Sequence, residues 1–158
     1  MALNDGLWAQ LDNTFQQDIP ATDQLLALLQ RERKALEQRD YEEFQQIIND
    51  KQPLLALLQS HAATRQQLLT AAGFDSESNT LNAVQQQAPL VAKAWHTLSA
   101  QWARCQELNE VNERIAKRTR LVVGQILDLM RGQQGQARLY TDKGNTSSGG
   151  GGRTITSA

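Results

Sequence analysis

Apolar positions recur at alternating spacings of four and three along residues 44–72. The face that they define consists of Phe44, Ile48, Lys51, Leu55, Leu58, Ala62, Arg65, Leu69 and Ala72. This spacing is typical of a helix with one buried side. Asp40 followed by Glu43 forms an N-cap pair before it, and Gly73 is a C-terminal stop signal after it. The pattern therefore predicts one long helix between Asp40 and Gly73.

A second apolar face precedes this helix and predicts another, ending near Arg39. Pro20 lies inside it and removes one backbone donor. The connection at 38–40 is so short that the two helices must form an antiparallel hairpin, and in that register Phe15 lies opposite Arg65. The face consists of Trp8, Leu11, Phe15, Ile19, Thr22, Leu26, Leu29 and Leu36.

A third apolar face predicts a helix over 89–131 that begins at Pro89, a residue suited to the first helical turn. Its spacing slips by three residues between Cys105 and Leu108, as in a coiled-coil stammer. This helix would exceed its partners by roughly 15 Å at 1.5 Å per residue, so part of it should overhang. With 74–87 read as irregular, the predicted fold class is all-α: an antiparallel helical hairpin plus a longer third helix, as a coiled-coil-like three-helix bundle.

Composition changes after Arg131, where seven of the ten glycines lie. A Gly/Ser/Thr-rich segment cannot bury enough apolar surface to offset its ordering entropy. We therefore expect a helical domain at 3–135 and a flexible, disordered C-terminal tail at 136–158.

Charge and cysteine content exclude several kinds of protein. The 16 basic and 17 acidic residues give a net charge of −1, without the clustered basic face of a nucleic-acid-binding protein or a polybasic membrane anchor. Cys105 is the only cysteine, which excludes an internal disulfide and a Cys-based zinc site. The first residues do not resemble a signal peptide, and the chain has no run of about 20 apolar residues that could insert stably into a membrane. These features predict a cytoplasmic protein.

The two histidines do not indicate chemistry. A di-iron bundle needs Glu three residues before His, whereas Leu58 precedes His61 and Lys93 precedes His96. We interpret both histidines as residues at the solvent edge of their helices. The sequence accordingly predicts no metal, no cofactor and no enzymatic activity.

Two charged residues and one asparagine are among the polar residues at seam positions. Lys51 and Arg65 either form a recognition site or, as we favour, cover the seam with their aliphatic stems while their charges reach water or a carboxylate such as Asp18. Asn112 is interpreted as a residue that fixes helix register.

The candidate binding site lies near the end of the third helix, where seven of ten residues at 121–130 are apolar. They cover more of the helix than one seam can bury, and exposed apolar surface usually marks a protein-binding site. Packing on the first helix, or on a second copy in a homodimer, remains the alternative. The candidates are Leu121, Val122, Val123, Ile126, Leu127, Leu129 and Met130.

Three segments together resemble the FlgN family of bacterial flagellar export chaperones. The first is an acidic-Lys pair followed by Leu-Leu, the second a Leu-Asn-x-x-Asn segment, and the third a Leu-Tyr segment ending in Thr. Here Thr141 and Asn145 replace the Gly and Gln of the family's tail. The segments are Asp50-Lys51 with Leu54-Leu55, Leu108-Asn109 with Asn112, and Leu139-Tyr140 with Thr146.

The resemblance implies a specific role. Members of that family hold hook-associated (hook–filament junction) proteins in the cytoplasm by their helical C-terminal segments, prevent premature assembly, and deliver them to the flagellar type III export apparatus without a cofactor. Their client-binding C-terminal helix corresponds here to Leu121–Met130, and Leu139 with Tyr140 would contact the export gate. The alternative is a structural coiled-coil adaptor that oligomerises through its third helix.

Overall fold

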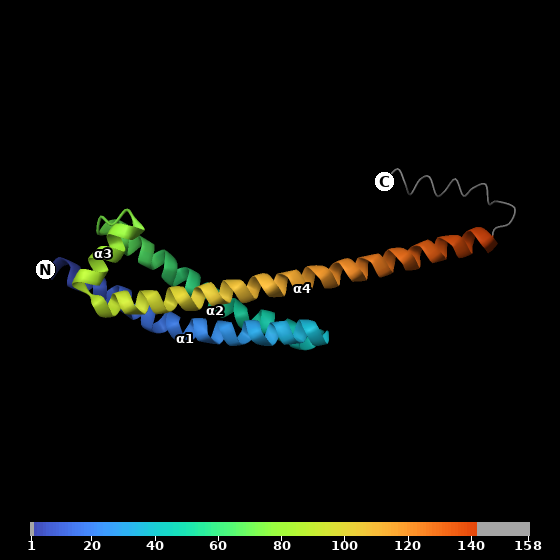
Figure 1. The fold of residues 1–158 in the computed structure, drawn as a ribbon, viewed down its shortest axis with the longest axis horizontal. Helices are drawn as coiled ribbons and strands as arrows, with labels where there is room; N and C mark the ends of the chain where they lie inside the picture. The colour runs from blue at the N-terminus through green and yellow to red at the C-terminus, as the bar shows by residue number, and fades with distance from the viewer. Residues whose placement is uncertain (1, 142–158) are drawn as a thin grey trace. The chain divides into compact units, whose positions relative to one another are not determined.

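A computed structural model of the chain describes residues 2–141, with side chains described for residues 4–132. Over that range every regular element is an α-helix (Figure 1). The predicted all-α class is thus confirmed for the described residues. The helices are α1 (Ala2–Gln38), α2 (Tyr41–Ala71), α3 (Glu77–Gln87) and α4 (Pro89–Thr141).

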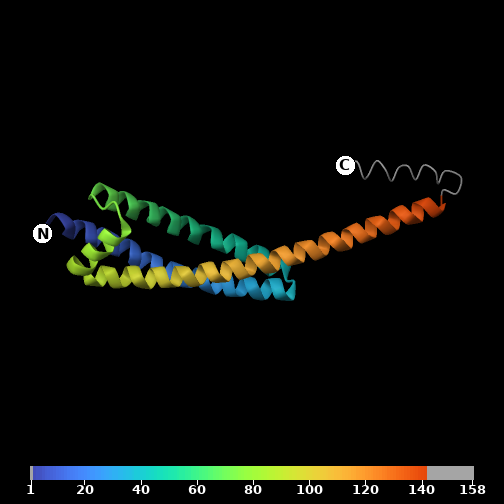
Figure 2. The same cartoon turned by 45° about the horizontal axis from the view of Figure 1, so that its top comes forward.

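The chain divides into two compact units between Ile115 and Ala116. The first unit contains α1, α2, α3 and the first part of α4. Within it α1 and α2 run antiparallel, and the first part of α4 runs beside α1 in the same direction (Figures 1 and 2). The second unit is the remainder of α4 as far as it is described.

Local sequence signals set the helix boundaries. The Asp40 side chain accepts a hydrogen bond of 3.1 Å from the Glu43 backbone N–H, so the predicted N-cap is confirmed. Gly73, with φ +85°, occupies the left-handed conformation that favours glycine after the end of α2. Pro89 is the first residue of α4, also as predicted. α1 continues through Pro20.

The stretch at 74–87, expected to be irregular, instead contains α3. Its N-cap is Ser76, whose Oγ accepts from the Asn79 N–H at 3.3 Å. Val84 of α3 is fully buried in a cluster that includes Trp8 and Leu11 of α1. The helix was missed because only two of its side chains are buried, which leaves almost no periodic signal.

The core lies in the first unit and is built mainly around α1. Leu11 and Phe15 are buried with Trp8, and the Phe15 and Trp95 ring centroids are 5.7 Å apart. A second cluster joins Ala21, Leu25 and Leu29 of α1 with Leu58 of α2 and Cys105 of α4, and a third contains Leu28, Ala35 and Ile47. Full burial of one such large aliphatic or aromatic side chain contributes about 1.5–3 kcal/mol.

α4 is longer than predicted. It was expected to end near Arg131 with a tail from 136, whereas it continues to Thr141. The added residues include Gln, Ala, Arg and Leu, whose helix propensity offsets the cost of Gly132 and Gly135. The remainder of the predicted tail, 142–158, lies outside the described residues.

Candidate protein-binding surface

The seven predicted apolar side chains lie in the second unit and are all exposed. Their exposed fractions run from 46% for Val123 and Leu127 to 67% for Leu121 and Leu129. Each side chain therefore leaves roughly half of its surface in contact with water. Gly124 sits among them, and a Cβ added there would meet no atom within 4 Å.

The helix turns by about 100° per residue, which places six of the seven on one side. These six span an arc of about 160° on that geometry, and we call them the distal apolar face. Leu121 falls outside the arc, beside Gln125 and Asp128. The structure thus brings six predicted residues together and separates Leu121 from them. The distal apolar face consists of Val122, Val123, Ile126, Leu127, Leu129 and Met130.

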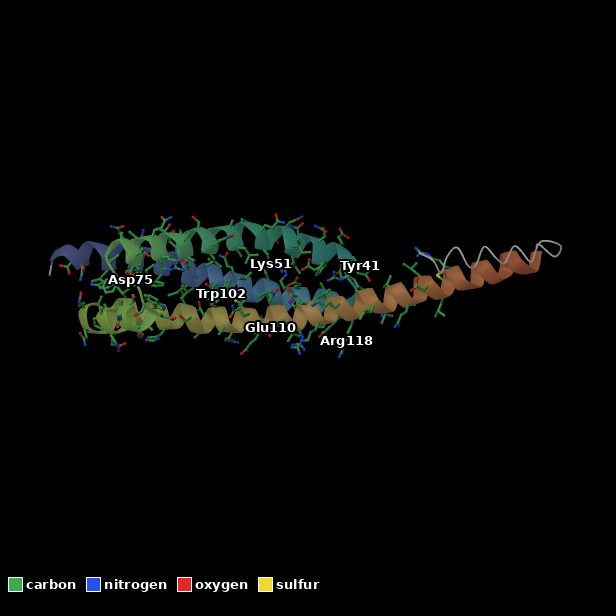
Figure 3. All side chains as sticks on the ribbon, turned by 90° about the horizontal axis from the view of Figure 1, so that it is seen from above. Tyr41, Lys51, Asp75, Trp102, Glu110 and Arg118 are labelled. Atoms are coloured by element: carbon green, nitrogen blue, oxygen red, sulfur yellow. The ribbon has the colours of Figure 1, made fainter. Side chains whose placement is uncertain are left out.

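Basic side chains border the distal apolar face. Arg118, labelled in Figure 3, lies one turn before Val122 at one edge. Arg120 and Arg131 lie at the other edge, three residues before Val123 and four after Leu127. All three arginines are exposed.

This surface has the composition and width of a helix-binding face. Its width exceeds that of a two-residue coiled-coil seam, and burying one of its large side chains in a partner would contribute about 1.5–3 kcal/mol. A contiguous exposed patch of this kind is characteristic of an interaction site. Leu139 and Tyr140, the predicted gate contacts, lie in α4, but their side chains fall outside the described residues.

Buried charges in the first unit have internal partners. Asp18 is fully buried, accepts a hydrogen bond from Arg65, and lies 2.5 Å from Nδ1 of His61. Sequence analysis expected the Arg65 charge to reach water or a carboxylate such as Asp18, and the structure shows the carboxylate. The position of Arg65 opposite Phe15 is confirmed, since the Phe15 ring centroid is 5.0 Å from the guanidinium. The interpretation of His61 as a solvent-edge residue is wrong, since its side chain is only 18% exposed and contacts a buried carboxylate. His96 is exposed, as expected.

A second polar network joins three helices. Lys51 donates to both carboxylate oxygens of Glu32 at 3.0 Å. Asn112, which is buried, donates to the Leu29 carbonyl at 2.9 Å and to Glu32 at 3.0 Å. These bonds link α1, α2 and α4 at fixed positions along their axes, which agrees with the interpretation of Asn112 as a residue that fixes helix register. Lys51 therefore contributes to packing in the first unit.

Sequence analysis did not identify an apolar groove in the first unit. Its volume is about 570 Å³, and it lies between α2 and α4 over Phe15 of α1. Leu55 and Trp102 on its walls are 41% and 39% exposed. Both residues occupy seam positions of their predicted helices. Incomplete coverage of that seam by a third helix was the signal in the sequence that could have indicated the groove. The apolar lining includes Phe15, Leu55, Leu58, Trp95, Leu98 and Trp102.

Two general properties can be stated of the described residues. They contain no group of three His, Cys, Asp or Glu side chains that could hold a metal ion. None of the helices in this part of the chain is both long and apolar enough to cross a membrane.

Over the described residues, fold and surface together define an all-helical protein that exposes an amphipathic helix segment. Comparison with known families matches residues 1–148 to the family described as FlgN protein. The crystal structure of a flagella synthesis protein FlgN from Pseudomonas aeruginosa is similar, with 31% identity and a TM-score of 0.63 over 69% of this chain and 88% of that one. Comparison with curated proteins gave no match. The chain therefore belongs to the FlgN family, which confirms the resemblance found in its sequence.

Proposed function

We propose that this protein is a cytoplasmic export chaperone for flagellar hook-associated proteins. It binds their helical C-terminal segments, keeps them from assembling prematurely, and delivers them to the flagellar type III export apparatus. This role needs binding surfaces and no catalysis or cofactor. Family membership supports the flagellar setting.

The observation that carries this proposal is the exposure of the distal apolar face. Six large apolar side chains on one helical arc are costly to leave in water unless a partner covers them. An amphipathic client helix would bury them in the helix-in-groove manner. Leu121 lies on another side of the helix and contributes to this site less than sequence analysis predicted.

Leu139 and Tyr140, near the C-terminal end of α4, are proposed to contact the export gate. This assignment rests on the Leu-Tyr segment shared with the family. It separates the two activities along the chain, because client binding uses 121–130 and delivery uses residues beyond 136.

The competing proposal is a structural coiled-coil adaptor, in which the distal apolar face of one copy packs on that of another. The same exposed side chains would serve it. Sedimentation across a range of protein concentrations distinguishes the two, because an adaptor dimerises with increasing concentration while a chaperone binds a client one to one.

The test of the chaperone proposal uses single carboxylate substitutions on the purified full chain. Ile126→Asp and Leu129→Asp place a charge in the proposed contact, and Gln125→Asp adds the same charge outside the distal apolar face. Loss of about 1.5–3 kcal/mol of burial should weaken binding of a hook-associated C-terminal fragment by at least about 10-fold in calorimetric titration. Gln125→Asp should bind as wild type does.

Thermal melts of the same variants complete this test. Ile126 and Leu129 are exposed, so their replacement should change stability by no more than about 0.5 kcal/mol. Wild-type client affinity in both variants would refute the site. A large fall in their melting temperature would instead mean that the face is packed within the folded protein.

A further inference from the structure

The charges around the distal apolar face are arranged unevenly. Residues 116–132 carry four basic side chains and one acidic one, a net charge of +3 in a chain whose total is −1. Three of the four basic groups, Arg118, Arg120 and Arg131, flank the apolar arc. Lys117 and the only carboxylate, Asp128, lie on the opposite side of the helix, on the geometry of about 100° per residue.

The three flanking arginines are available to a partner. All are exposed, and among the described side chains none of the ion pairs includes them. Three arginines of the first unit do form ion pairs: Arg31 with Glu43, Arg33 with Glu37, and Arg65 with Asp18. Residues 116–132 therefore present guanidinium groups beside apolar surface, and within that described stretch no acidic residue lies at those edges.

Guanidinium groups at the edge of an apolar contact select carboxylates. A planar guanidinium can bind a carboxylate through two parallel N–H···O bonds. In paired helices such charges occupy the positions that flank the buried stripe and determine which partner is accepted. A partner with basic edges would be repelled at the same positions.

We infer that the helix accepted by the distal apolar face is an acidic amphipathic helix, with Asp or Glu on both borders of its apolar stripe. This rests on the proposed function and adds the charge of the client segment. Arg118 meets an acid at one border, and Arg120 with Arg131 meets acids at the other. The apolar face supplies affinity, and the arginines supply selectivity and orientation.

An anionic lipid surface could use the same charges, but the helix fits it poorly. Membrane-surface helices concentrate Lys and Arg across their polar side and carry Trp, Phe or Leu on the apolar side. Residues 116–132 contain no aromatic residue, and their polar side includes Asp128. A protein helix is therefore the better match.

The test uses three synthetic amphipathic peptides that share one Leu/Ile stripe. Their border positions carry Glu, Gln or Lys, and binding to the full chain is measured by fluorescence anisotropy. The Glu peptide should bind about 10-fold more tightly than the Gln peptide, and the Lys peptide more weakly than both. The advantage of Glu should shrink as NaCl rises from about 0.05 to 0.5 M.

Charge reversal on the chaperone provides the matched control. Arg118→Glu and Arg120→Glu should each lower affinity for the Glu peptide by about 3–10-fold and raise affinity for the Lys peptide. Lys117→Glu makes the same change on the opposite side of the helix and should leave the order of the three peptides unaltered. All three positions are exposed, and thermal melts of each variant verify that the fold is retained.

The outcomes separate this inference from the proposed function. Equal binding of the Glu and Gln peptides would overturn the acidic-helix inference, while an Ile126-dependent contact with hook-associated fragments would keep the chaperone proposal intact. Failure of all three peptides to bind would overturn the surface as a helix site. Arginine-dependent binding to phosphatidylglycerol vesicles, with no preference among peptides, would assign the charges to a lipid surface and also overturn the inference.

Discussion

Removal of the Asp18 carboxylate is the most direct test of how the first unit is held together. Asp18 lies on α1, and its two partners, His61 and Arg65, lie one turn apart on α2. The carboxylate is fully buried, and the side chains of His61 and Arg65 are only 18% and 15% exposed. Asp18→Ala would therefore leave the guanidinium of Arg65 in a largely buried site without a counter-ion.

The expected loss follows from that burial. Breaking a buried ion pair by removing one partner costs about 3–5 kcal/mol, and the slight exposure of Arg65 favours the lower end of that range. For a folded unit of this size a loss of about 3 kcal/mol lowers the melting temperature by roughly 10–20 °C. Asp75→Ala removes an exposed carboxylate from the loop before α3 and should change stability by about 0.5 kcal/mol or less.

The assay is urea unfolding followed by circular dichroism at constant pH, for Asp18→Ala, Arg65→Ala and the double variant. The double variant should lose much less than the sum of the two single losses, because each single change already breaks the pair. A loss below about 1 kcal/mol for Asp18→Ala would refute the reasoning. It would mean that water reaches Arg65 in the native state.

Two further predictions concern other parts of the chain. Burial raises the pKa of the Cys105 thiol, with Asp23 adding to the rise, so iodoacetamide should alkylate the folded protein at least about 10-fold more slowly than the urea-unfolded chain at pH 8. The pKa of Cys105 is higher in the folded state than in the unfolded chain. The stability that Cys105 contributes is therefore complete below the unfolded pKa and is lost as pH rises through the folded pKa. The urea midpoint should accordingly fall less steeply above pH 8 in Cys105→Ala than in wild type. Deletion of 137–158 should leave the melting temperature within about 5 °C, retain binding of a hook-associated fragment, and abolish export of that client in cells. Loss of client binding by the truncated chain would show that delivery and binding are not separate.

Local signals in the sequence were sufficient where a boundary depends on a few neighbouring residues. Asp40, Gly73 and Pro89 act through their own backbone or through a bond three residues away, so their roles can be predicted without knowledge of the fold. Ser76 belongs to the same class. Its capping role indicates the start of α3, although the periodicity that follows is weak.

Contacts between distant residues were harder to predict. The pairing of Arg65 with Asp18 was accessible, because two adjacent antiparallel helices define each other's register. The contact of His61 was missed because His61 lies next to the predicted seam position Ala62 and not on the seam itself. The end of α4 also differs from expectation, because glycine counts suggested a tail where the intervening residues favour helix.

The candidate surface was predictable as a set of residues but not as a shape. An excess of apolar residues at 121–130 identified the segment. Its division into a six-residue face with Leu121 on the other side became apparent only with an uninterrupted helix through Gly124. The arginines that flank the distal apolar face were not predicted, because a total charge close to zero does not show how charges are distributed along the chain.

The unbroken course of α4 has a consequence for the timing of helix opening. Side chains from Arg120 to Gly132 are exposed apart from Gly124, so little side-chain burial supports the backbone there, and each glycine costs about 1 kcal/mol relative to alanine. The packed residues 89–115 supply the helical nucleus, so this segment needs only to propagate from it. Amide hydrogens should therefore exchange fastest near the C-terminal end of α4 and progressively more slowly toward Ile115. A bound client helix would slow that exchange over 121–130, and its release would begin with unwinding at the C-terminal end of α4.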